Sequence, residues 1–498
     1  MSQNALLPLL LIASSLLPGL VIFFLPENAV RPRTVLNLTG AIAKLLLVAF
    51  MLWGVSRGES YAVSYPLLPG IDFSLRADPL ALLFVSLSAV LWFLTTVYAI
   101  AYLEDAPNRA RFFGFFSLCV TATVGVAMAG NLLTFLLFYE LLTLSTYPLV
   151  VHRETPEARA AGNRYLVYTL CGGAALLLGT AWLYLETGTL TFAPRGFVAG
   201  SDTPAWALVT IFFLLVSGVG VKAALVPLHG WLPRAMVAPA PVSALLHAVA
   251  VVKAGAFGIV RIVYDVFGVE YAADLGVMDA LAASAAITII YGSLRALTQD
   301  DLKRRLAFST VSQVSYIALG VAIVGPLASI GGLVHLVHQG LMKITLFFCA
   351  GNYAETLGLH KVSELDGVGR RMPLTTAAFS VGALGMIGLP PMAGFISKWY
   401  LGLGALEAGD TWAVVVLAGS SALNAAYFLP ILHRAWFCPP AGDWPPLPAG
   451  ARAETALALL VPPVLTALMV ILAGLLAASP YSPQDWATLV VLREFYAP

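Results

Sequence analysis

Stretches of about 20 mostly apolar residues recur along almost the whole chain, and this feature limits its possible folds more than any other. Only 11% of the residues are charged, whereas a soluble domain usually carries about 25%. Lipid must therefore be the solvent for most of the chain, and we predict an all-α polytopic membrane protein with about fourteen transmembrane helices. The predicted spans are residues 5–25, 35–55, 80–103, 112–129, 131–151, 163–185, 205–226, 241–264, 276–294, 306–324, 328–353, 374–402, 411–436 and 455–477.

Basic residues are distributed unevenly between the two sides of these spans. Seventeen of them, Arg452 included, lie in or beside the loops that follow odd-numbered spans, and only five follow even-numbered spans. Basic loops stay in the cytoplasm, so we expect a cell inner membrane protein with both termini on the outer, periplasmic side. The first stretch has neither a basic segment before it nor an A-x-A cleavage site, so we interpret it as a span rather than a signal peptide.

Two predicted spans contain proline and glycine where a helix should be continuous. Span 7 runs into Pro227, and span 12 contains Pro390 and Pro391. Proline removes a backbone donor, so both helices should unwind locally, and matched breaks of this kind are typical of inverted-repeat transporters. Ordinary proline kinks are the alternative. We expect N-terminal helices 1–3 in residues 1–111, five-helix repeats of spans 4–8 and 9–13 in residues 112–264 and 275–436, and a C-terminal loop with helix 14 in residues 437–498.

Lysine and arginine are segregated along the chain. Twenty arginines lie almost entirely in loops or at span ends, whereas five of the seven lysines lie inside predicted spans. A charge at the bilayer centre costs at least about 2.5–3.5 kcal/mol, so these lysines need partners or water. Lysine can release its proton when buried and arginine cannot, so buried lysines suit a proton relay. The five are Lys44, Lys222, Lys253, Lys343 and Lys398.

Other polar residues within the spans extend this pattern. Glu140 is the one acidic residue clearly in mid-span, so it is the expected counter-ion of a relay lysine; a structural salt bridge is the alternative. Lys44 lies outside both repeats, where snorkelling or lipid binding explains it more simply. The spacing of His335, His338 and Gln339 predicts a polar stripe beside Lys343 that could pass protons; a metal site would lack a third ligand. His229 and His247 are further supporting polar residues.

The sequence gives no sign of a cofactor, a metal or nucleic acid. The four cysteines are scattered, which argues against a disulfide framework, a zinc site and an iron–sulfur cluster. No Walker sequence or dinucleotide fingerprint is present. The net charge of +1 and the lack of a basic stripe argue against nucleic acid. With no catalytic or redox site of its own, the chain would belong to an enzyme only as part of a proton-pumping oxidoreductase.

Several spaced motifs together resemble the proton-conducting antiporter-type subunits of respiratory complex I, Mrp cation/proton antiporters and membrane-bound hydrogenases. They are Phe138-Tyr139-Glu140, Lys222 with the run 227–233, the run 238–247 ending in His247, and Gly388-Leu389-Pro390-Pro391 followed by Lys398. The resemblance covers spans three to thirteen. It implies that Glu140 pairs with Lys222, that Lys253 is the central lysine, that Lys343 lies on a connecting helix, and that Lys398 is the exit-side group. Related proteins often have histidine where this chain has Gln339, and His338 is the expected substitute.

The same resemblance suggests which member this is. A length of 498 leaves no room for the lateral helix of the largest subunits, Lys398 replaces the glutamate usual in the M-type subunit of complex I, and the run 241–247 is less like the N-type subunit. The D-type subunit of Mrp antiporters remains, which implies other membrane subunits as partners and H⁺, with Na⁺ or K⁺ open, as the ion. Alternatives are a pumping subunit of complex I or a hydrogenase, a stand-alone secondary transporter, a scaffold with relic charges, and a subunit lining a quinone pocket.

Overall fold

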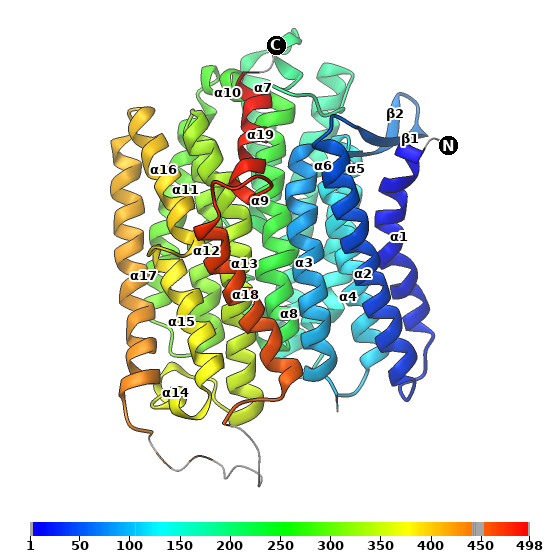
Figure 1. Ribbon diagram of the computed structural model, residues 1–498. Helices are drawn as coiled ribbons and strands as arrows, with labels where there is room; N and C mark the ends of the chain where they lie inside the picture. The colour runs from blue at the N-terminus through cyan, green and yellow to red at the C-terminus, as the bar shows by residue number, and fades with distance from the viewer. Residues whose placement is uncertain (1–2, 105, 441, 443, 445–452, 497–498) are drawn as a thin grey trace.

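The computed structural model describes residues 3–104, 106–440, 442, 444 and 453–496, so Arg452 lies outside the described residues. The chain forms a bundle of long helices with both termini at one end (Figure 1). We call this the terminal end and the other the opposite end. Within the described residues, twelve helices are long and apolar enough to cross a membrane. The polar helix α12 and the broken pair α15 and α16 add two crossings, so the prediction of an all-α membrane protein with about fourteen spans is confirmed.

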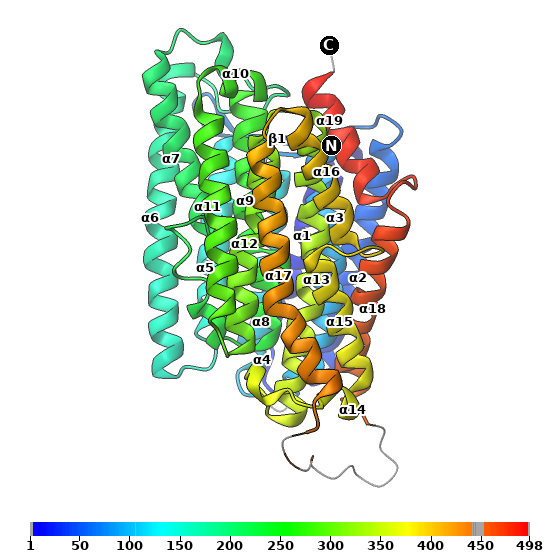
Figure 2. The ribbon, with the colours of Figure 1, turned by 90° about the vertical axis from the view of Figure 1, so that its left-hand side faces the viewer.

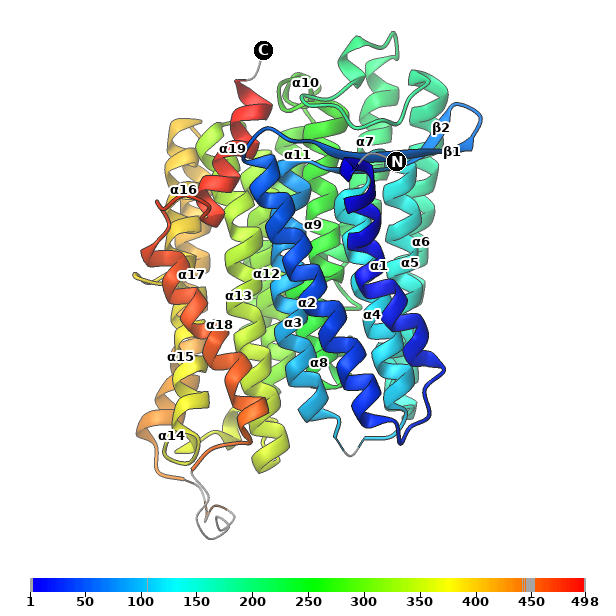
Figure 3. The ribbon, with the colours of Figure 1, turned by 45° about the vertical axis from the view of Figure 1, so that its right-hand side comes forward.

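The N-terminal helices are joined by a hairpin that the sequence did not predict. The polar loop at 56–79 forms two antiparallel strands that lie across the terminal end (Figure 3), with Tyr61 paired to Ala77 and Tyr65 to Phe73. Side chains alternate at its start, since Tyr61 and Val63 are buried while the residues between and after them are exposed. The elements are α1 (Gln3–Phe23), α2 (Val30–Val55), β1 (Tyr61–Leu68), β2 (Ile71–Ala77) and α3 (Pro79–Tyr102).

Two sets of five crossings follow, and they share their order of long and broken helices. The third helix of each set has 32 residues, and the fourth crossing of each is interrupted. The first set comprises α4 (Arg109–Met128), α5 (Leu132–Val150), α6 (Pro156–Thr187), α7 (Ala205–Ala223) with η2 (Arg234–Val237), and a crossing built from α8 (Ala240–Ala244), η3 (Leu245–Val249), α9 (Val251–Arg261) and η4 (Ile262–Phe267). The second comprises α11 (Val277–Leu297), α12 (Leu302–Ala322), α13 (Pro326–Leu357), α15 (Pro373–Ile387) with α16 (Ala393–Glu407), and α17 (Thr411–Phe437).

Shorter elements connect and close the bundle. Helix α19 was not predicted, since it follows the last span and is amphipathic rather than apolar. It packs on α3 and α13 near the terminal end. The remaining elements are η1 (Val198–Gly200), α10 (Val269–Asp274), η5 (Val362–Glu364), α14 (Val368–Arg371), α18 (Leu457–Leu475) and α19 (Pro483–Phe495).

Both predicted helix breaks are present. Helix α7 ends where Ala224 adopts a left-handed φ of 58°, and Pro227 lies in the non-helical turn that follows. Helix α15 ends where Gly388 adopts a φ of 97°, a conformation that glycine tolerates best, and Pro390 and Pro391 lie before α16 begins. Figure 1 shows α15 and α16 following one another in a single crossing. Both breaks therefore leave helix-end carbonyls without partners in their own helix.

Two helices form the centre of the bundle. Every residue of α9 is buried, and so is every residue of α13 from Ala328 to Tyr353. Helix α13 packs against α12, α15, α16 and α18, and Figure 2 shows it between neighbours on either side. A helix that is buried all round contacts protein and not lipid, so polar side chains on α9 and α13 are shielded from the bilayer.

Candidate functional site

The first of the predicted relay lysines lies where α5 meets the end of α7. Lys222, in the last turn of α7, is fully buried and donates a hydrogen bond to the carbonyl of Tyr139. Its ammonium lies 3.3 Å from the centre of the Tyr139 ring, a cation–π contact. The Tyr139 hydroxyl in turn donates to the Gly218 carbonyl at 3.1 Å. Tyr139 therefore holds the end of α7 from both its main chain and its side chain.

Glu140 lies beside this contact without a direct ion pair to Lys222 within 4 Å in the described part of the chain. The charges of the two groups still interact, and Glu140 is half-buried. Its carboxylate packs against α6 at Gly173, where a β-carbon would lie 2.8 Å from the Glu140 carboxyl carbon. The absence of a side chain at Gly173 thus makes room for the carboxylate near Lys222.

Lys253 on α9 connects the first set to α13. It is fully buried, and its ammonium donates to the Leu336 carbonyl at 2.6 Å. Helices α7 and α9 approach closely at this level, since a β-carbon at Gly255 would lie 2.6 Å from the carbonyl carbon of Lys222. Just before α9, the π-helical segment η3 interrupts the helix, a feature often found at functional sites. It carries His247, which is fully buried and stacks on Phe347 at 4.5 Å.

The predicted polar stripe on α13 is present and buried. His335 shares a hydrogen bond of 2.8 Å with the Ser397 hydroxyl of α16 and stacks on Tyr316. His338 lies beside the Ala393 backbone, and both polar side-chain atoms of Gln339 have no protein hydrogen-bond partner in the described structure. Lys253 is close enough for its charge to act on His335 and His338. The stripe is therefore a buried polar surface with unused hydrogen-bonding capacity.

Lys343, further along α13, contacts α12. Its ammonium donates to the Ser309 hydroxyl at 2.6 Å and to the Leu306 carbonyl at 3.2 Å. The Tyr427 hydroxyl of α17 donates to the same Ser309 oxygen at 2.9 Å. A serine in a span serves helix packing as often as chemistry, and Tyr427 carries no local signal of its role, so the sequence did not predict either contact. Lys343, Ser309 and Tyr427 form a continuous hydrogen-bonded chain across three helices.

Lys398 lies at the second helix break. Its ammonium donates to the carbonyls of Met386 and Ile387 at 3.0 and 2.9 Å, and to the Ser421 hydroxyl of α17 at 2.9 Å. The two carbonyls belong to the last turn of α15, the negative end of its dipole, so the lysine caps the broken helix. The side chain is half-buried, but all three donor hydrogens have acceptors.

Two predicted polar residues lie outside this series of contacts. His229 follows the α7 break, is half-buried, and packs its ring against Tyr291 at 4.9 Å. Lys44 does not snorkel: it is fully buried and donates to the Leu11 carbonyl at 2.9 Å and the Ser15 hydroxyl at 3.0 Å. The sequence could not show this, because helices α1 and α2 face each other around that side chain.

A buried ion cluster lies at the terminal end, and the sequence did not predict it. Arg261 donates to both carboxylate oxygens of Asp78 at 2.8 and 2.9 Å and to Asp265 at 2.7 Å. Arg493 of α19 lies 3.2 Å from Asp265 and 3.6 Å from Asp78. Arg261 and Asp265 are four residues apart, but no local pattern connects them to Asp78 and Arg493, which are far away along the chain. The cluster fastens α19 to α3 and to the end of the α9 crossing.

The chain matches the family model "NADH:quinone oxidoreductase/Mrp antiporter, TM" over residues 129–424, and the complex I chain 5 N-terminus model over 69–113. It is 38% identical to NADH-quinone oxidoreductase subunit N of Desulforudis audaxviator, over 84% of this chain and 85% of that protein. It superposes on a chain of the archaeal membrane-bound sulfane sulfur reductase (TM-score 0.86, 26% identity, 97% of each chain). It also superposes on a chain of the Mrp complex from Dietzia sp. DQ12-45-1b (TM-score 0.85, 24% identity, 100% and 98%).

The family models cover more than half of the chain, and the broken helices and the lysines from Lys222 to Lys398 lie within the longer match. These matches do not single out one subunit type, because the named relatives belong to different complexes. The chain belongs to the NADH:quinone oxidoreductase/Mrp antiporter family of membrane subunits.

Proposed function

We propose that this chain translocates protons through a relay of Lys222, Lys253, Lys343 and Lys398, with Glu140 as the partner charge of Lys222. The observation that carries this proposal is that each of these four buried or half-buried lysines contacts a neighbouring helix of the bundle. Lys222 reaches from α7 to α5, Lys253 from α9 to α13, Lys343 from α13 to α12, and Lys398 from α16 to α15 and α17.

Hydration is the second support. Buried polar atoms cost free energy unless they are hydrogen-bonded, so the unpartnered nitrogens of His247 and the unpartnered amide of Gln339 favour water in this region. Water between titratable groups allows a proton to pass where no two side chains touch. In this scheme, moving Glu140 or its charge away from Lys222 lowers the preference of that lysine for its proton, and the proton moves toward Lys253.

The cellular setting is proposed from the distribution of basic residues and from the relatives of the chain. We propose a subunit of a larger inner-membrane complex, with the terminal end outside and the arginine-rich opposite end in the cytoplasm. The proposed repeats are residues 112–264 and 275–436. Lys398 favours a D-type subunit of an Mrp antiporter, which would couple H⁺ to Na⁺ or K⁺; the 38% identity to an N-type subunit favours a pumping subunit of complex I instead. Purifying the native complex and identifying its other subunits separates the two.

Proton flux into liposomes tests the relay. The Lys222→Ala protein should be inserted and assembled normally, yet lose most of its flux under an imposed pH gradient. Lys361→Ala is the matched control, since Lys361 is exposed at the opposite end and should leave flux unchanged. Wild-type flux from Lys222→Ala would refute the relay, and full cation/proton exchange by the isolated chain would favour a stand-alone transporter.

A further inference from the structure

A cavity of about 580 Å³ opens at the opposite end of the bundle, between the two five-crossing sets. Its walls come from the α5–α6 loop, the start of α6 and η2 in the first set, and from the start of α12 and the end of α13 in the second. The volume lies within the usual range for small-ligand sites, about 300–1,000 Å³. None of the proposed relay residues is among the described residues that line it.

The cavity has an excess of positive charge. Asp301 is already engaged as the N-cap of α12, where its carboxylate accepts from the Arg304 backbone at 2.7 Å. None of the four basic side chains forms an ion pair within 4 Å with a carboxylate in the described part of the chain. The charged residues lining the cavity are Arg153, Arg234, Lys303, Arg304, Glu157 and Asp301.

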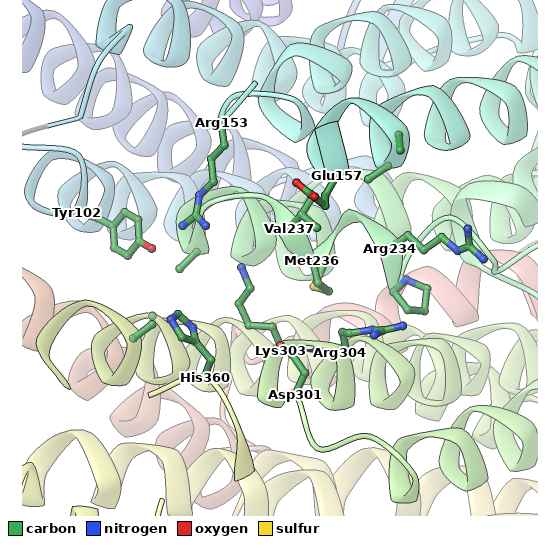
Figure 4. A pocket seen from close by; sticks show the side chains of 16 residues that line it. Tyr102, Arg153, Glu157, Arg234, Met236, Val237, Asp301, Lys303, Arg304 and His360 are labelled. Atoms are coloured by element: carbon green, nitrogen blue, oxygen red, sulfur yellow. Dashed lines mark hydrogen bonds between the residues drawn. The ribbon is translucent and has the colours of Figure 1, made fainter. Parts of the chain in front are cut away.

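Four hydrogen-bond donors face one part of this cavity. Figure 4 shows the Arg153 guanidinium, the Lys303 ammonium, the His360 ring and the Tyr102 hydroxyl around the same space. Arg153 and Lys303 are close enough for their like charges to repel, and Arg153 interacts with the Tyr102 hydroxyl. Lys303 also donates to the Ala238 carbonyl at 2.6 Å, which holds it in place. An anion placed between the two cations would replace repulsion by attraction.

We propose that this cavity binds a phosphate group, held by Arg153 and Lys303 with Tyr102 and His360 as further donors. A tetrahedral oxyanion presents several acceptor oxygens in different directions, as donors from four separate segments require. Such a group could come from an anionic phospholipid headgroup or from free phosphate. The cavity lies at the ends of the spans, where headgroups are found, and basic pockets between helices on this side are typical lipid sites.

The ligand would connect the two halves of the protein. Arg153 precedes α6 in the first set, whereas Lys303 lies in the first turn of α12 and His360 follows α13 in the second. A phosphate bound to both would hold these segments together at the end where the cavity separates the two sets. This site is independent of the proton relay, because it uses none of the relay residues.

Binding to the purified full-length chain in nanodiscs tests this proposal. One arm compares phosphatidylcholine nanodiscs with nanodiscs that also contain phosphatidylglycerol, and native mass spectrometry measures the retained anionic lipid. The other adds inorganic phosphate to phosphatidylcholine nanodiscs and measures the shift in melting temperature. If phosphatidylglycerol is retained and phosphate leaves the melting temperature unchanged, the source is a lipid headgroup. If phosphate raises the melting temperature, the site binds the free ion.

Substitutions connect the binding to these residues. Arg153→Gln and Lys303→Gln should each weaken binding of the probe that the wild-type protein binds by about tenfold or more, since each removes a charge-assisted hydrogen bond. Lys303→Arg should retain binding, and Arg164→Gln is the control, because Arg164 is exposed on α6 and does not line the cavity. Failure of both probes to bind the wild-type protein, or unchanged binding by Lys303→Gln, would overturn the proposal.

Discussion

At Gly255, α9 packs directly against the backbone at the end of α7, and replacing this glycine with alanine tests whether this spacing positions the relay. A β-carbon there would lie 2.6 Å from the Lys222 carbonyl carbon and 2.8 Å from the Ala223 α-carbon. Carbon atoms in contact normally lie about 3.5–4.0 Å apart, so the two segments must separate by about 1 Å. The obstacle is backbone, which cannot rotate away as a side chain can.

This separation should affect transport more than folding. Overpacking of a core usually costs about 1–3 kcal/mol, which a bundle of this size tolerates. The end of α7 is the part that can move, since it is followed by a break and not by another helical turn. Its movement would pull Lys222 away from the Tyr139 carbonyl and ring. A misplacement of about 1 Å can reduce the rate of a geometry-dependent step about 100-fold, so we expect proton flux to fall between about tenfold and 100-fold.

The assay is proton flux into liposomes, with insertion and melting temperature measured on the same preparations. Gly419→Ala is the matched control: Gly419 also lies within a long helix, α17, but nothing in the described structure is within 4 Å of the position of its β-carbon. That variant should keep full flux and gain up to about 1 kcal/mol of helix stability. If Gly255→Ala is assembled and transports like the wild type, the α7–α9 spacing does not position the relay.

Three further predictions concern other contacts. Gly173→Ala should lower proton flux in the same liposomes without unfolding the protein, because its β-carbon would displace the Glu140 carboxylate from α6; normal flux would separate Glu140 from the mechanism. Arg261→Met should destabilise the protein by about 3–5 kcal/mol, since it removes the buried cation shared by two buried aspartates and leaves them with longer contacts to the more exposed Arg493, and an unchanged melting temperature would contradict this. Burial and the charge of Asp265 raise the pKa of Glu494 to about 7 from its ordinary 4.5. The folded state therefore holds this proton more tightly, so stability should fall as the pH rises between these values, and Glu494→Gln should remove that slope from the melting curves.

The features that the sequence predicted correctly are those set by neighbouring residues. A span is recognised by its own apolar composition, and a break by its own proline and glycine, so the spans and the interruptions at Pro227 and Pro390 were found. The placement of His335, His338 and Gln339 on one buried helix also needed no tertiary information, because they follow helical spacing within one segment. The π-helical segment at His247 was not predicted, since nothing in its local sequence marks it; it packs against α13 and α3, which are distant along the chain.

Only the tertiary fold could decide which groups the buried side chains contact. The acceptor of Lys253 is a backbone carbonyl on α13, and Asp78, one partner of Arg261, lies 183 residues away in the sequence. Lys44 has the same composition around it as a snorkelling lysine, yet the packing of α1 on α2 encloses it. By itself, the sequence determined which helices cross the membrane, where two of them break and which side chains are costly to bury. Tertiary structure alone decided what those side chains contact, because a hydrogen bond or an ion pair requires two groups that only packing brings together.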